Sequence, residues 1–169
     1  MRDDTRPDTV DAIEAAWRRE RPDVEFGSIG AITRVYRLAR HLERARARAL
    51  AGLGTDQPTL ETLGPLRRAG PPYRMTSGEL QRASLVTSGA VSQRLERLER
   101  EGLVIRLPDP DDRRGVIVEL TLSGHELIER VVAELMRREE ALLAQFSADE
   151  RATLVELLRR WLRLFEPSG

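Results

Sequence analysis

Residues 85–124 read LVTSGAVSQRLERLEREGLVIRLPDPDDRRGVIVELTLSG and carry the strongest fold signal in the chain. Thr87 or Ser88 can cap a helix here, because short hydroxyl side chains accept a hydrogen bond from a free N–H of the first turn. Gly102 is a typical residue just beyond a helix C-terminus. The buried positions expected at helical spacing are Val91, Leu95 and Leu98. The stretch therefore predicts an amphipathic helix from Ser88 to Glu101.

Two apolar segments after this helix predict a β-hairpin. LVIRL at 103–107 and VIVELT at 116–121 have the composition of short strands. The loop PDPDDRRG at 108–115 joins them and carries two adjacent arginines, Arg113 and Arg114. A hairpin placed directly after a helix in this way predicts a wing.

A second short helix precedes residue 85. Thr76-Ser77-Gly78-Glu79 fits a capping box, and the helix it opens extends to about Ser84. Two helices joined by a turn of three or four residues form a helix-turn-helix. The predicted fold class is mainly α with a small β wing, that is, a winged helix-turn-helix flanked by dimerisation helices.

The rest of the chain predicts further helices. Start and stop signals place them at 8–20, 28–51, 58–68, from Ser123 to about Ala144, and from Ser147 onward. Asp8 can cap the first, Pro58 suits the first turn of the third, and Ser123–Glu126 and Ser147–Glu150 are capping-box patterns. The predicted organisation has three parts: N-terminal helices for dimerisation at 1–57, the winged helix-turn-helix domain at 58–121 and C-terminal dimerisation helices at 122–169.

Composition narrows the classes of function. The chain has 169 residues, 28 basic and 28 acidic side chains, a net charge of zero and no cysteine, and every basic residue is arginine. Disulfides and cysteine chemistry are thereby excluded, and no apolar run approaches the length of a membrane span. MRDDTRPD lacks a signal-peptide core, so a cytoplasmic location is expected. Between Gly27 and Thr55 the chain has six arginines and only one acidic residue. A net charge of zero therefore does not argue against a nucleic-acid partner, because binding depends on a local basic face.

Catalytic and metal sites have no visible basis in the sequence. His41 and His125 lie on different predicted helices with no companion at ligand spacing. No phosphate-binding glycine loop and no nucleophile motif is present. We expect no enzymatic activity, no metal and no cofactor.

Small polar residues at the start of the helix at Ser88 favour contact with DNA. Such residues reach base edges in a major groove, and paired arginines in a wing suit a minor groove. The residues predicted to bind DNA are Thr87, Ser88, Gly89, Ser92, Gln93, Arg97, Asp112, Arg113 and Arg114. An ordinary solvated helix face remains an alternative for the helical residues. The alternative at the level of function is a winged-helix module that binds a protein partner without sequence-specific DNA binding.

The stretch 85–124 resembles the recognition helix and wing of MarR-family transcription factors, most specifically in D-x-D-D-R-R followed by a V/L-x-L-T strand end. The resemblance extends over about residues 28–165. It implies a homodimer on a pseudo-palindromic operator, with the helix matching 88–101 in the major groove. It also implies that Arg114 enters the minor groove and that Asp112 supports it.

A narrower resemblance points to an effector. The extra first helix with Trp17, and GPPYRMTSGEL at 70–80, are similar to the urate-responsive branch of that family. The ligand-binding positions of the branch match Trp17, Glu61, Arg94 and Arg106, although the branch has Asp where this chain has Glu61. The prediction is a repressor released from DNA by a small anionic or aromatic metabolite such as urate or another purine, bound between the added helix and the winged domain. Two alternatives remain open. Trp17 can be an aromatic residue of the dimer core, and Arg94 and Glu61 can be surface residues or a structural ion pair.

Overall fold

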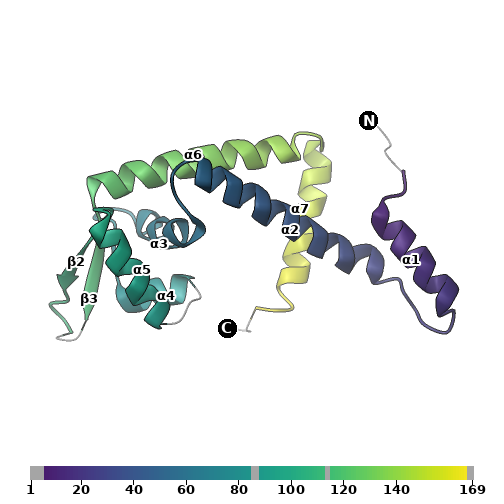
Figure 1. Cartoon of the computed structure of the whole chain (residues 1–169), viewed down its shortest axis with the longest axis horizontal. Coiled ribbons are helices and arrows are strands. Elements are labelled where there is room, and N and C mark those ends of the chain that lie inside the picture. The colour runs from purple at the N-terminus through teal and green to yellow at the C-terminus, as the bar shows by residue number, and fades with distance from the viewer. Residues whose placement is uncertain (1–5, 85–87, 113–114, 167–169) are drawn as a thin grey trace. The chain divides into compact units, whose positions relative to one another are not determined.

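The computed structural model describes residues 6–84, 88–112 and 115–166, excluding the side chains of residues 84, 88 and 90. The described residues form seven helices and three short strands (Figure 1). In chain order these are α1 (Thr9–Glu20), α2 (Ile29–Gly52), α3 (Gln57–Arg68), β1 (Arg74–Thr76), α4 (Ser77–Ser84), α5 (Ser88–Arg100), β2 (Val104–Pro108), β3 (Val116–Leu120), α6 (Leu122–Leu143) and α7 (Ala148–Leu162). Two compact units divide the chain, residues 1–52 and 53–169. The predicted fold class is confirmed.

The N-terminal unit joins α1 to α2 through an acidic helix start. Asp8 caps α1 as predicted, and Asp11 completes a capping box by accepting from the Asp8 N–H. Arg34 of α2 donates to Asp8 Oδ2 at 2.9 Å and to Asp11 Oδ1 at 2.7 Å. Val10, between these two carboxylates in the sequence, is buried. The first turn of α1 is therefore held both by its own cap and by an arginine of the next helix.

A three-stranded antiparallel sheet forms the wing region of the second unit. The strand order is β1–β3–β2, with Met75 opposite Val118 and Arg106 opposite Val118 on the other side. The predicted hairpin is confirmed as β2 and β3, which extend together in Figure 1. β1 was not predicted, because three residues are too few to show a strand pattern. The central strand is consequently β3, and it has a partner along both edges.

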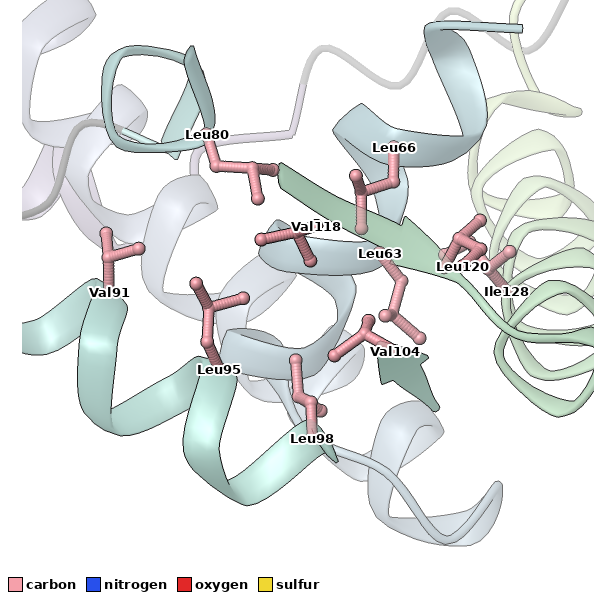
Figure 2. Packing of buried hydrophobic residues seen from close by; sticks show 10 residues of the cluster. All are labelled: Leu63, Leu66, Leu80, Val91, Leu95, Leu98, Val104, Val118, Leu120 and Ile128. Carbon is pink, nitrogen blue, oxygen red and sulfur yellow. The ribbon is translucent and has the colours of Figure 1, made fainter. Parts of the chain in front are cut away.

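The helix-turn-helix elements and the sheet share one core. Figure 2 shows the side chains of α5 facing those of α3, β2 and β3 around Val118. The ten buried residues of this core are Leu63, Leu66, Leu80, Val91, Leu95, Leu98, Val104, Val118, Leu120 and Ile128. Burial of Val91, Leu95 and Leu98 on one face of α5 is confirmed. The recognition-helix candidate thus rests on a core completed within its own unit.

The start of α6 differs from the prediction. Thr121, and not Ser123, caps this helix, accepting from the Gly124 N–H at 3.0 Å. The Thr121 hydroxyl also donates to the Gly102 carbonyl at 2.7 Å, so the cap is selected by a contact with the end of α5. Gly124 packs so closely here that a Cβ would lie 2.0 Å from the Leu103 carbonyl oxygen. The prediction of a Ser123 cap is wrong because it used local pattern alone.

Beyond this junction, α6 and α7 leave apolar side chains uncovered. α6 buries Ile128, Val131 and Leu135, whereas α7 buries none of its residues. The predicted capping box of Ser147 and Glu150 at the start of α7 is confirmed. The exposed large apolar residues from α6 onward are Leu122, Val132, Met136, Leu142, Phe146, Leu154, Val155, Leu157, Leu158, Leu162, Leu164 and Phe165. Among the described helices, none is both long and apolar enough to cross a membrane.

Candidate nucleic-acid interface

The outer face of α5 carries the predicted polar residues. Gly89, Ser92 and Gln93 are exposed, and Glu96 and Arg100 continue the same face one turn at a time. Because α5 has 3.6 residues per turn, this face lies opposite the buried Val91, Leu95 and Leu98. Ser88 is the first residue of α5, and Thr87 lies outside the described residues. The helix therefore presents a surface of small and polar side chains on a rigid apolar support.

The start of α4 is fixed by the predicted capping box. Thr76 Oγ1 accepts from the Glu79 N–H at 3.2 Å, and Glu79 Oε2 accepts from the Thr76 N–H at 2.8 Å. The bonds that the Glu79 carboxylate accepts from the Thr76 N–H and hydroxyl lower the pKa of Glu79 below its ordinary value. The reciprocal pair sets where α4 leaves β1, and hence where the helix-turn-helix begins.

The loop between β2 and β3 is closed by backbone contacts. The Asp109 N–H donates to the Gly115 carbonyl at 3.1 Å, and the Gly115 N–H donates to the Asp112 carbonyl at 2.8 Å. A side chain at Gly115 would meet Asp109, whose Cβ would lie 2.7 Å from the added carbon. Asp112 is exposed in this loop, and the predicted minor-groove residues Arg113 and Arg114 lie outside the described residues.

Two of the predicted ligand-binding residues meet between α3 and α5. Arg94 Nη1 donates to Glu61 Oε2 at 2.9 Å, with both side chains partly buried. Glu61 Oε1 also accepts from the Gln57 side chain at 3.1 Å. The structure thus contains the Glu61–Arg94 ion pair that the sequence analysis gave as the alternative to ligand binding.

The other two predicted ligand-binding residues lie elsewhere. Arg106 of β2 pairs with Glu99 of α5 at 2.6 Å, and its hydrogen bond lowers the pKa of Glu99. Trp17 belongs to the N-terminal unit, where its ring stacks on Phe26 at 5.8 Å between centroids and where half of its surface is exposed. Sequence reasoning did not foresee Glu99 as the partner of Arg106, since that pair forms between the end of a helix and the strand that follows it.

A second ion pair between α3 and α5 was also not predicted. Arg97 Nη1 donates to Asp56 Oδ2 at 2.6 Å, and Nη2 donates to Asp56 Oδ1 at 3.0 Å and to Thr59 Oγ1 at 2.8 Å. Asp56 is at the same time the N-cap of α3, accepting from the Thr59 N–H at 2.9 Å. The hydrogen bonds from Arg97 hold the pKa of Asp56 well below its usual range. The sequence position of Asp56, two residues before Pro58, indicates a helix N-cap. Its bond to Arg97 cannot be predicted in the same way, because it depends on where α5 lies in the folded protein.

No group of three or more histidine, cysteine or acidic residues suited to a metal ion occurs in the described parts of the chain. His125 instead packs edge-on against Tyr73, 4.9 Å between ring centroids.

The chain is similar in sequence and in structure to known transcriptional regulators. A family model described as the MarR family matches residues 53–115. The HTH-type transcriptional regulator PecS of Dickeya dadantii is 33% identical over 151 residues, which cover 89% of this chain and 91% of that protein. A mutant of MarR from Escherichia coli, solved in complex with operator DNA, superposes with a TM-score of 0.68 at 29% identity, over 82% of this chain and 99% of that one. Sco3205 of Streptomyces coelicolor, a MarR family regulator solved in complex with DNA, gives a TM-score of 0.73 at 25% identity, over 86% of this chain and 93% of that one.

Proposed function

This chain belongs to the MarR family of DNA-binding transcriptional regulators, and on that premise we propose that it is a homodimeric repressor released from its operator by a small planar anion. The observation that carries the proposal is the face of α5 with Gly89, Ser92 and Gln93 exposed, directly opposite three buried apolar residues. Short polar side chains at the start of a helix reach base edges, and a rigid support holds them in register.

The wing supplies the second contact of the proposal. The β2–β3 hairpin is short, and its loop carries Arg113 and Arg114 in sequence beside the exposed Asp112. An arginine is attracted to the enhanced negative potential of a narrow minor groove. α5 would then read the major groove while Arg114 anchors the wing in the neighbouring minor groove.

The homodimer is supported by the uncovered apolar faces. α7 has no buried residue, and Leu157, Leu158 and Leu162 are about half exposed. Monomeric proteins rarely leave contiguous apolar patches of this kind in water. A two-fold dimer would cover them and would place two copies of α5 on half-sites about one helical turn apart.

The effector is proposed to act at the Arg94–Glu61 pair. A guanidinium donates two parallel hydrogen bonds to planar acceptors, so an anionic purine such as urate can replace a carboxylate as its partner. Glu61 would compete with the ligand for Arg94, and Arg106, paired with Glu99 at the other end of α5, offers a second cation. The ligand dissociates the complex only if it binds the free protein better than the DNA-bound protein.

DNA binding is tested by fluorescence anisotropy with labelled DNA from upstream of the protein's own coding region, against unrelated DNA of equal length. Arg114→Ala is expected to weaken operator binding by about 1–3 kcal/mol without changing the fold, because the wing contact is local. Arg137→Ala is the matched control, since Arg137 pairs with Glu134 on α6. If Arg114→Ala binds like the parent at moderate salt, the wing does not enter the groove.

The effector is tested by titrating urate, xanthine and salicylate into the protein–operator complex. The parent is expected to release DNA with at least one of these anions. Arg94→Ala should still bind the operator and should need a much higher ligand concentration for release. If all three anions leave the parent complex intact, the effector proposal fails while the DNA-binding proposal stands.

A further inference from the structure

The ion pair of Arg97 with Asp56 joins the last turn of α5 to the N-cap of α3. Two guanidinium nitrogens of Arg97 meet both oxygens of one carboxylate, at 2.6 and 3.0 Å. A forked pair of this kind restrains direction as well as distance, because its two parallel bonds must be satisfied together. The pair therefore limits rotation of α5 about its own axis and sliding along α3.

The carboxylate end of this pair is itself immobilised. Asp56 Oδ1 accepts from the Thr59 N–H at 2.9 Å and from the Thr59 hydroxyl at 2.6 Å, and that hydroxyl oxygen accepts from Arg97 Nη2. Asp56 thus caps α3 and anchors Arg97 with the same side chain. Since Leu63 and Leu66 of α3 belong to the core, the helix that carries this anchor is packed into the apolar core of the unit.

The arginine end lies on the flank of α5 and not on its outer face. Arg97 stands between Leu98, which is buried, and the exposed row of Ser92, Gln93 and Glu96. Its Nε is shielded from solvent and has no hydrogen-bond partner in the described structure. The guanidinium is consequently directed into the α3–α5 junction, and a base contact by Arg97 would require these bonds to be exchanged.

We propose that Arg97 is a positioning residue for DNA recognition: through Asp56 it sets the rotation of α5 that presents Ser92 and Gln93 to the operator, without contacting DNA itself. This inference rests on the proposed DNA-binding function. It competes directly with the expectation from sequence that Arg97 binds DNA. Partly exposed ion pairs add little to stability, so the contribution expected of this pair is geometric.

The test is a double-mutant cycle on operator binding, with Arg97→Gln, Asp56→Asn and the two combined. Asn is as good an N-cap as Asp, so Asp56→Asn removes the ion pair while α3 keeps its cap. Each single variant is expected to lose operator affinity by a similar factor, about 5- to 150-fold, the usual range for coupled sites. The double variant should lose no more than either single one, because both remove the same link.

Two further measurements distinguish a positioning role of Arg97 from a direct contact between Arg97 and DNA. The slope of log affinity against log salt should stay at the parent value, since no phosphate contact is removed, and affinity for unrelated DNA should stay unchanged. Arg97→Lys should recover only part of the lost affinity, because an ammonium cannot form the fork. Arg68→Gln, at the exposed end of α3, is the control and should match the parent.

Three outcomes would overturn the inference. The first is Arg97→Gln weakening binding and lowering the salt slope by about 1 while Asp56→Asn binds like the parent, which would make Arg97 a phosphate contact. The second is both variants binding like the parent. The third is losses that add up in the double variant. Thermal melts identify variants that fail to fold, in which case Asp56→Asn and Arg97→Lys carry the test. If the parent protein itself does not prefer operator DNA over unrelated DNA, the proposed DNA-binding function is contradicted, and not only the role of Arg97.

Discussion

Helices α5 and α7 have similar lengths, 13 and 15 residues, and both are amphipathic, but their apolar faces have different surroundings. On α5, Val91, Leu95 and Leu98 are 6%, 3% and 0% exposed. On α7, Leu157, Leu158 and Leu162 are 55%, 47% and 59% exposed. An apolar stripe therefore predicts that a helix face will be covered, but it does not say whether the same chain or another one covers it.

The apolar faces of α5 and α7 therefore contribute to two different free energies, that of folding and that of self-association. The winged-helix core is completed by α3, α4, α5, the sheet and the first turns of α6, so its stability is a property of one chain. In the proposed homodimer, the apolar face of α7 is stabilised only by association with the second copy. Substitutions in the two helices should accordingly change different measurable quantities.

The largest expected effect is on the α5 side. Leu98→Ala removes a fully buried side chain and leaves a cavity, which should lower the free energy of unfolding by about 2–5 kcal/mol. Urea denaturation followed by circular dichroism measures the change, with Glu96→Ala on the exposed face as the control. Self-association of the folded protein, measured by sedimentation, should stay at the parent value. A loss below 1 kcal/mol would mean that α5 is less tightly packed than its burial implies.

A smaller effect is expected on the α7 side. Leu158→Ser should weaken self-association by about 1–2 kcal/mol, since full burial of a leucine contributes about 1.5–3 kcal/mol and this side chain is already half covered. Sedimentation at a series of protein concentrations measures it, and operator affinity should fall at the lowest concentrations. Arg160→Ser on the same helix is the control. Sedimentation of the variant identical to that of the parent at every concentration would exclude α7 from the dimer interface.

The smallest effect concerns acid stability at the α3–α5 junction. Arg97 lowers the pKa of Asp56, so the pair stabilises the folded protein fully above the ordinary carboxyl pKa near 4. That stabilisation is lost as pH falls below about 4 toward the lower folded-state pKa. The difference in Tm between the parent and Asp56→Asn should be constant from pH 8 to 5 and should shrink below pH 4.

Glu134 provides the control for this titration. Its pKa is lowered to about 2 by hydrogen bonds from Arg137 and Arg138, but both partners lie on α6 itself. Glu134→Gln should change Tm less than Asp56→Asn, because an exposed pair within one helix joins no separate elements. An equal change in both variants would remove the distinction between the junction and the helix surface.

Most of the helices and strands that the sequence predicts depend on interactions between residues close together in the chain. Asp8, Ser147 and Thr76 cap helices through atoms within three residues of themselves, and their sequence spacing already contains that geometry. The end of α5 follows in the same way, because Gly102 adopts a positive φ of 71°. The β2–β3 hairpin is also local, since its loop is short.

Errors and omissions arose where a distant segment selects the structure. Thr121 caps α6 in place of Ser123 because its hydroxyl also reaches Gly102, 19 residues away. β1 is a strand only because β3 lies beside it. Within the candidate site, the Glu61–Arg94 ion pair was an alternative that the sequence analysis left open, whereas the Arg97–Asp56 and Arg106–Glu99 pairs were not considered.

The sequence by itself determined the helices, the caps at Asp8, Thr76 and Ser147, the hairpin and the polar outer face of α5, because each depends on periodicity or on bonds between near neighbours. Only the tertiary structure decided which charges meet. Arginine side chains are long and can pair with any acid within reach, so the partners of Arg94, Arg97 and Arg106 follow from the packing of α3 against α5 and of α5 against β2. That packing is set by the apolar core, in which residues 35 or more positions apart, such as Leu63 and Leu98, come together.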